Sequence, residues 1–94
     1  MELRFKSKFA RDLRKITDKK TNGAIAKIIL QIDSARSIVQ IPHLVKLNKY
    51  EVLYRIKIKL DQKRDYRMVL SIRKNIVWAE RVLHRDVVYE YFRR

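Results

Sequence analysis

The stretch "VLYRIKIKLDQKRDYRMVLSIR", residues 52–73, alternates apolar and polar side chains on both sides of a short polar break. The apolar side chains before the break share one face of an extended chain, and they are Val52, Tyr54, Ile56, Ile58 and Leu60. Those after the break repeat the pattern with Tyr66, Met68, Leu70 and Ile72. Because successive side chains of a strand point to opposite faces, the pattern predicts strands over 52–60 and 66–73. "DQKR" (61–64) is then the hairpin loop between them.

The other face of this hairpin is basic. We call it the basic face, and its charged members are Arg55, Lys57, Lys59, Arg67 and Arg73. A lysine or arginine on a solvated strand is ordinary when taken singly. Nothing structural favours gathering like charges on adjacent strands, because they repel one another. Neighbouring strands lie ~4.8 Å apart and successive nucleic-acid phosphates ~3.4 Å apart along the axis, so several of these side chains can reach one sugar–phosphate chain.

The flanking segments supply the remaining elements. "NIVWAERVLH" (75–84) is apolar on both faces at its centre, which predicts a strand in the middle of a sheet, and "ELRFK" (2–6) reads as a short strand. Apolar stripes predict a helix from Ser7 to Ile16, with Ser7 as its cap, and a second over 23–35 after a break at 18–23. "QIPHLVKL" (40–47) contains Pro42 and is expected to be a loop or an edge element. Asp86 could cap a last helix over 87–93.

We therefore expect one α+β domain over residues 1–94, with the element order β-α-α-β-β-β-α. The last three strands form an antiparallel meander, a helical hairpin covers one sheet face, and a short helix ends the chain. Because two helices can bury only one face of the sheet, we expect the basic face to be solvated.

Net charge is the strongest compositional signal. The chain has 24 basic and 10 acidic residues, a net charge of +14, and residues 46–74 hold ten of the basic ones. Such self-repulsion disfavours a compact chain, and a polyanionic partner relieves it. Nucleic acid and an acidic protein are the leading candidates.

Several classes of protein are disfavoured. With no cysteine and only His43 and His84, the chain lacks thiolate and histidine-rich metal sites, so we expect neither metal nor cofactor. No Gly-rich phosphate loop or Ser/His/Asp set is present. Asp61 with Asp65 is expected to serve turn chemistry rather than to bind a metal. Neither a signal peptide nor a membrane span is recognisable, so we expect a cytoplasmic protein that does not enter a membrane.

The C-terminal stretch "VLHRDVVYEYF" (82–92) leaves two interpretations open. Arg85 and Tyr89 could form one edge of a phosphate site, since arginine can make bidentate hydrogen bonds to phosphate and tyrosine can stack on a base. Alternatively, Tyr89 and its neighbours seal the core while Arg85 lies at the surface. His84 could act as an acid or base, although a single histidine at a strand end is more often structural.

At this point the sequence resembles a family. "MELRFKSKFARDLRKI", "KLNKYEVLYRIKIKL", "DYRMVLSI" and "HRDVVYEYF" are similar, in this order, to segments of the RelE/ParE superfamily of toxins from type II toxin–antitoxin systems. For RelE-like members the resemblance implies a ribosome-dependent endoribonuclease, an mRNA interferase that cuts mRNA without metal through the substrate's own 2′-OH. ParE-like members share the fold and poison DNA gyrase. A non-enzymatic basic module that binds nucleic acid is a further alternative.

Carried over residue by residue, the resemblance implies roles for named side chains. Arg67 and Lys57 stabilise the transition state, Arg55 and Arg85 clamp phosphate, and Tyr89 stacks on a base or transfers a proton. The catalytic set is then Lys57, Arg67, Arg85 and Tyr89, and the RNA-binding set is Arg55, Lys59, Arg73, Lys46 and Lys49. One departure is Leu83, because well-studied RelE members carry an arginine at that position. Either Arg85 takes this role or cleavage is weakened.

The resemblance also implies partners. We expect mRNA on the ribosome as the target and an acidic antitoxin that forms a hetero-oligomer with the toxin. The positive charge independently favours an acidic partner. We expect the antitoxin to pack apolar side chains on the helices or on a sheet edge.

Overall fold

The computed structural model describes residues 1–47 and 52–91, with side chains described as far as Val88. Its strands are β1 (Glu2–Phe5), β2 (Leu44–Lys46), β3 (Leu53–Lys59), β4 (Asp65–Arg73) and β5 (Ile76–His84). Its helices are α1 (Ser7–Lys15), α2 (Lys19–Ser34), a 3-10 turn over Ile38–Gln40, and α3 (Arg85–Tyr91). The α+β class and the predicted order of the main elements are confirmed. The segment expected to be a loop or an edge element supplies β2.

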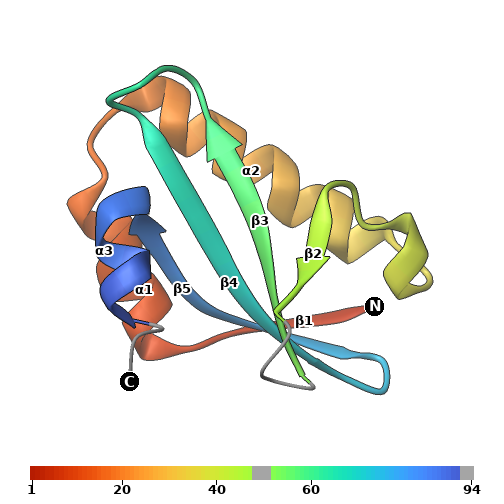
Figure 1. Cartoon of the computed structure of the whole chain (residues 1–94). Helices are drawn as coiled ribbons and strands as arrows, with labels where there is room; N and C mark the ends of the chain where they lie inside the picture. The colour runs from red at the N-terminus through yellow and green to blue at the C-terminus, as the bar shows by residue number, and fades with distance from the viewer. Residues whose placement is uncertain (48–51, 92–94) are drawn as a thin grey trace.

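The five strands form one sheet with the order β1-β5-β4-β3-β2 (Figure 1). β3, β4 and β5 form the predicted antiparallel meander. β1 pairs parallel with β5, so β5 has a strand on each side, as its two apolar faces predicted. β2 is a three-residue strand at the far edge, antiparallel to β3. Pro42 precedes it, where a missing backbone N–H costs the sheet no hydrogen bond.

A β-bulge at Glu80 decides which way the end of β5 faces. Ala79 pairs with Leu70, but Arg81 pairs with Val69, so Glu80 is an extra residue on β5. An inserted residue shifts the alternation of side chains by one position. Ala79 and Val82 consequently both belong to the core under the helices. Leu83 is thereby turned to the basic face, opposite Arg67.

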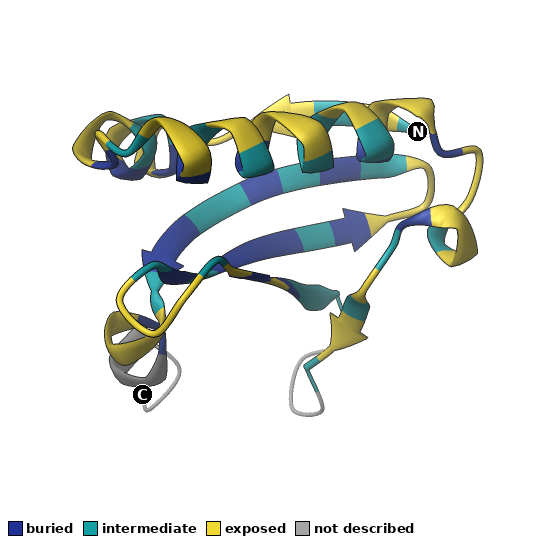
Figure 2. Ribbon diagram, turned by 90° about the horizontal axis from the view of Figure 1, so that it is seen from above, coloured by how far each residue is buried: buried dark blue, intermediate teal, exposed yellow. Residues whose placement is uncertain are grey.

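α1 and α2 cover one face of the sheet, and α3 lies on the other side (Figure 2). Phe9 of α1 and Ile25 and Ile32 of α2 are fully buried against the helix-facing residues of the strands. α2 begins at Lys19, earlier than predicted, because the carboxylate of Asp18 accepts a hydrogen bond from the N–H of Thr21 at 2.8 Å. The expected cap of α1 is wrong: Lys6 stands at that position, and its side chain makes no capping bond.

Asp12 fastens α1 to the part of β5 that β1 does not reach. Its buried carboxylate accepts two hydrogen bonds from the Arg81 side chain, at 2.7 and 2.9 Å. It also accepts the N–H of Val82 at 3.1 Å. β1 pairs with β5 only as far as Ala79. Asp12 therefore takes the place of a strand partner for the β5 edge.

The basic face is not solvated throughout, because α3 packs on it. Val69 of β4, Leu83 of β5 and Val88 of α3 are buried together there, with Leu53 against them. The prediction of an uncovered face is therefore wrong where β4 and β5 lie under α3. Leu83 supplies part of the apolar contact that seats this helix.

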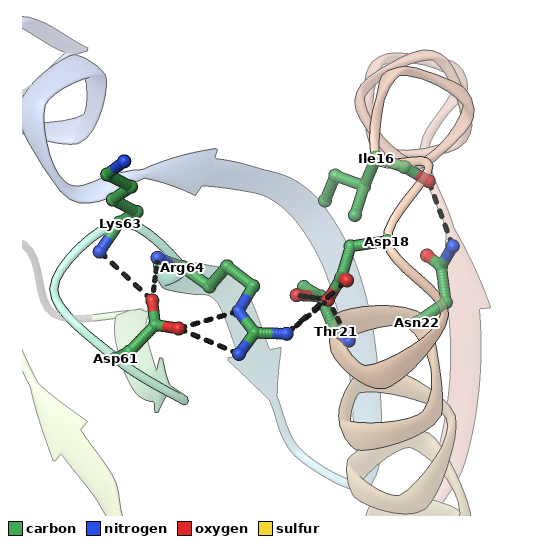
Figure 3. Close-up of polar contacts among 7 residues, drawn as sticks. All are labelled: Ile16, Asp18, Thr21, Asn22, Asp61, Lys63 and Arg64. Carbon is green, nitrogen blue, oxygen red and sulfur yellow. Dashed lines mark hydrogen bonds and ion pairs between the residues drawn. The ribbon is translucent and has the colours of Figure 1, made fainter.

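An ion-pair network holds the β3–β4 turn against the start of α2 (Figure 3). The carboxylate of Asp61 accepts the backbone N–H of Lys63 and of Arg64, at 3.0 and 2.8 Å, as the predicted turn chemistry requires. The Arg64 side chain bridges Asp61 at 2.7 Å and Asp18 at 3.3 Å. Hydrogen bonds from the Arg64 side chain, and from the turn's N–H groups, lower the pKa of Asp61 to about 2.

Candidate nucleic-acid interface

Two rows of charged side chains meet on the basic face at the end of the sheet beside the β3–β4 turn. Lys57 lies directly opposite Arg67, and Lys59 lies directly opposite Asp65. Paired strands are ~4.8 Å apart and alternate residues of a strand are ~6.8 Å apart. Three cations and one carboxylate therefore occupy an area comparable to two nucleotides of an RNA backbone. We call these four residues the β3–β4 charge cluster.

Lys57 and Lys59 are exposed, as expected, but Arg67 is not. Arg67 is only 7% exposed. Its guanidinium is ion-paired with Asp65, which is 2% exposed, and it also donates to the carbonyl of Tyr66 at 3.2 Å. The expectation that Arg67 faces solvent is therefore wrong. Its charge is already satisfied inside the protein.

Asp65 belongs to this cluster rather than to turn chemistry, which corrects its sequence assignment. Burial alone raises the pKa of its carboxyl group. The hydrogen bond and charge of Arg67, with the charges of Lys59 and Lys57, outweigh that effect and hold the pKa below its usual value. Asp65 is therefore a carboxylate at neutral pH. An aspartate directly before a Tyr-Arg pair at a strand start gave no sign of this role, because Asp is also a common turn residue.

Arg85 and His84 lie at the same end of the sheet, where β5 passes into α3. Arg85 is exposed and is the first residue of the helix. His84 accepts the N–H of Asp86 at Nδ1, at 3.3 Å, so its Nε2–H donates to the carbonyl of Lys63 at 3.0 Å. The imidazole thus ties the start of α3 to the β3–β4 turn. This arrangement favours the structural interpretation of His84.

The other residues expected to contact RNA are dispersed. Arg55 is half-buried on the basic face, one row further along β3 and opposite Val69. Arg73 lies on the same face at the far end of β4, ~20 Å along the strand from Arg67. Lys46 lies opposite Tyr54, which packs against the core under the helices, so Lys46 is on the other face of the sheet. Lys49 and the side chain of Tyr89 lie outside the described residues; the backbone of Tyr89 is in α3.

A second feature of the basic face, absent from the sequence interpretation, involves Trp78. Trp78 lies opposite Arg4 of β1 and is only half-buried. The guanidinium of Arg4 lies 5.5 Å and the ammonium of Lys6 lies 4.4 Å from the ring centroid. Both cations are thereby held at the β1 edge by the π face of the indole.

The cluster has the chemistry of a phosphodiester site. The exposed ammonium groups of Lys57 and Lys59, on the strand paired with that of Arg67, are groups of the kind that attract an anionic backbone. A guanidinium can stabilise charge that develops on phosphate oxygens. Among residues 1–47 and 52–88, no group of three or more His, Cys, Asp or Glu side chains could hold a metal ion. None of the helices in the described ranges is long and apolar enough to cross a bilayer.

The chain is similar to known proteins in its three-dimensional structure. Neither a protein-family model nor a curated protein matches the chain. A RelB–RelE antitoxin–toxin complex from Methanococcus jannaschii contains a chain 25% identical to this one, with a TM-score of 0.78. The match covers 95% of this chain and 98% of that one.

Two E. coli structures give the same fold at lower identity. A chain of the intact RelBE toxin–antitoxin complex is 20% identical, with a TM-score of 0.67 over 88% of this chain and 94% of that one. An E. coli RelE variant in the free state is also 20% identical, with a TM-score of 0.69 over 96% of this chain and 88% of that one. The five-stranded sheet, the helix pair on one face and the short C-terminal helix therefore constitute a RelE-like toxin fold that extends over most of this chain.

Proposed function

We propose that the chain is the toxin of a type II toxin–antitoxin pair and that it cleaves mRNA on the ribosome. The observation that carries the proposal is the β3–β4 charge cluster, in which Lys57 and Lys59 are exposed beside Arg67. The RelE-like fold supports the same function, since the similar solved structures are RelE toxins, two of them in complex with RelB antitoxins.

The reaction that fits these side chains is an intramolecular transfer within the RNA. The 2′-oxygen attacks the adjacent phosphorus, the bond from phosphorus to the 5′-oxygen breaks, and the fragments carry a 2′,3′-cyclic phosphate and a 5′-hydroxyl. One proton leaves the 2′-oxygen and one reaches the 5′-oxygen. In this proposal Lys57 and Arg67 stabilise the negative charge of the pentacoordinate state, and Tyr89 stacks on a base or transfers a proton.

Substrate positioning comes from the surrounding cations. Arg85 is exposed at the start of α3, next to the same end of β4 and β5, so it can bind a neighbouring phosphate. Arg55 lies one row away on β3. Leu83, at the position where well-studied RelE members carry an arginine, packs against α3 instead. In this proposal Arg85 provides the C-terminal guanidinium.

The proposed antitoxin is an acidic protein that packs apolar side chains on this chain. Two grooves on the helix side suit such a partner. One, of about 320 Å³, lies between α1 and α2 and is lined by Leu13, Arg14, Asn22, Ile25, Ala26 and Ile29. The other, of about 360 Å³, lies at the end of α2 and includes Leu30, which is largely exposed. The net charge of +14 favours an acidic occupant.

Induction of the chain in bacteria without an antitoxin tests the function. We expect growth arrest, and we expect primer extension to map new 5′ ends within translated messages. Growth arrest with intact messages would exclude the ribonuclease. Inhibition of supercoiling by the purified protein would then identify gyrase as the target. Salt-dependent binding to nucleic acid without growth arrest would leave a non-enzymatic module.

A further inference from the structure

An internal anion lies among the cations of the proposed site. Asp65 is ion-paired with Arg67, and both side chains are nearly fully buried. Lys59 stands directly opposite Asp65 and Lys57 directly opposite Arg67. The Asp65 carboxylate accepts from the Arg67 guanidinium, a donor that also binds phosphate oxygens. The charges of Lys59 and Lys57 act on the same carboxylate.

We propose that the carboxylate of Asp65 fills the position at which a phosphate group of RNA binds, so that Arg67, Lys57 and Lys59 form one anion site that is occupied from within when RNA is absent. This inference rests on the proposed function, because it assumes RNA as the ligand. Binding of a phosphate at Arg67 then requires exchange for Asp65.

The charge count of the cluster supports this exchange. The cluster contains three cations and one carboxylate, so its four residues keep a net charge of +2. A phosphodiester carries one negative charge, like the carboxylate, and presents oxygens of similar hydrogen-bonding capacity. Loss of the Asp65 charge frees one further cation for RNA, because Arg67 no longer has an ionised partner beside it.

Salt dependence of binding distinguishes this exchange from a purely structural role of Asp65. The logarithm of affinity for a single strand falls with the logarithm of salt concentration by about 0.7 for each phosphate neutralised. If Asp65 competes with a phosphate, Asp65→Asn tightens RNA binding about three- to tenfold at low salt and steepens this slope by about 0.7. A mere loss of stability would do neither.

The experiment measures fluorescence anisotropy of a short, labelled single-stranded RNA whose 2′-oxygens are methylated, so that it cannot be cleaved. Asp33→Asn is the matched control, because Asp33 is exposed on α2 and the substitution changes net charge equally. In the Arg67→Gln background, Asp65→Asn should no longer tighten binding. Unchanged or weaker binding by Asp65→Asn, or an equal gain from Asp33→Asn, overturns the proposal.

A measurement on the unaltered chain guards against misfolding of the variants. NMR signals of the Asp65 carboxyl carbon and the Arg67 Nε–H should move as the methylated RNA is added, while those of Asp12, whose buried carboxylate is ion-paired with Arg81, stay fixed. If the Asp65 and Arg67 signals remain still at saturating RNA, the exchange does not occur. Neither measurement depends on cleavage. Intact messages in growing cells would therefore reject the ribonuclease without deciding whether RNA displaces Asp65, which the binding and NMR measurements test separately.

Discussion

Leu83→Ala is expected to loosen α3 from the basic face. Leu83 is 8% exposed and packs with Val69 and Val88 in a small cluster apart from the main core. Leu→Ala substitutions in cores cost about 2–5 kcal/mol, the lower values where the site can collapse. A cluster of only three buried residues, separate from the main core, can relax, so we expect a loss of about 2–3 kcal/mol in the free energy of unfolding.

The predicted loss is large for a chain of this size. At about 4–8 °C per kcal/mol for a small domain, the melting temperature should fall by about 10–20 °C. Circular dichroism measures this fall, and hydrogen exchange locates it, because the amides of α3 should exchange faster while those of α2 change less. Val87→Ala is the matched control: Val87 is on the same helix but 48% exposed, so its loss should cost less than about 0.5 kcal/mol. Equal effects of the two substitutions, or unchanged exchange in α3, would refute the packing described here.

Three further predictions concern the contacts around the site. Asp12→Ala removes the acceptor of the Val82 N–H and of two Arg81 hydrogen bonds, so it should lower the free energy of unfolding by about 2–3 kcal/mol in urea titrations. Burial raises the pKa of Asp65, but its cationic neighbours lower the pKa by more than burial raises it. This carboxylate therefore stabilises the fold above about pH 4, and the contribution is lost as pH falls through the lowered pKa. The urea midpoint of Asp65→Asn should accordingly fall less steeply with acid than that of the unaltered chain. Tyr89→Phe should bind RNA normally but cleave about 10²-fold more slowly in single-turnover assays, and an unchanged rate would restrict Tyr89 to stacking.

Hydrophobic periodicity predicted the meander and the two long helices because burial fixes which side chains share a face. The alternation predicted which side chains of 52–60 and of 66–73 share a face, and in the sheet two members of that face, Ile56 and Met68, lie opposite each other. The bulge at Glu80 could not be predicted in this way. The residue types of the strand do not show which residue is left unpaired, yet the bulge turns Leu83 from one face of the sheet to the other.

The site was predicted less completely than the fold. Lys57, Lys59 and Arg67 share the expected face, but the burial of Arg67 depends on tertiary contacts that strand periodicity does not contain. Lys46 lies on the other face of the sheet because of how β2 is aligned with β3. The sequence of a three-residue edge strand contains too little hydrophobic pattern to predict that alignment. Asp65 gave no sequence signal, since its role depends on what lies across from it in the sheet.

The most direct test of the central claim, that the basic face at the β3–β4 turn acts on mRNA, is cleavage by the purified chain of an end-labelled message bound to ribosomes. We expect discrete cuts that leave 2′,3′-cyclic phosphate ends. We expect Lys57→Gln, which removes an exposed charge of the cluster, to abolish them. Lys27→Gln, which removes an exposed charge on α2, should leave them unchanged. An intact message with the unaltered chain, or equal cleavage by the two variants, would contradict the account.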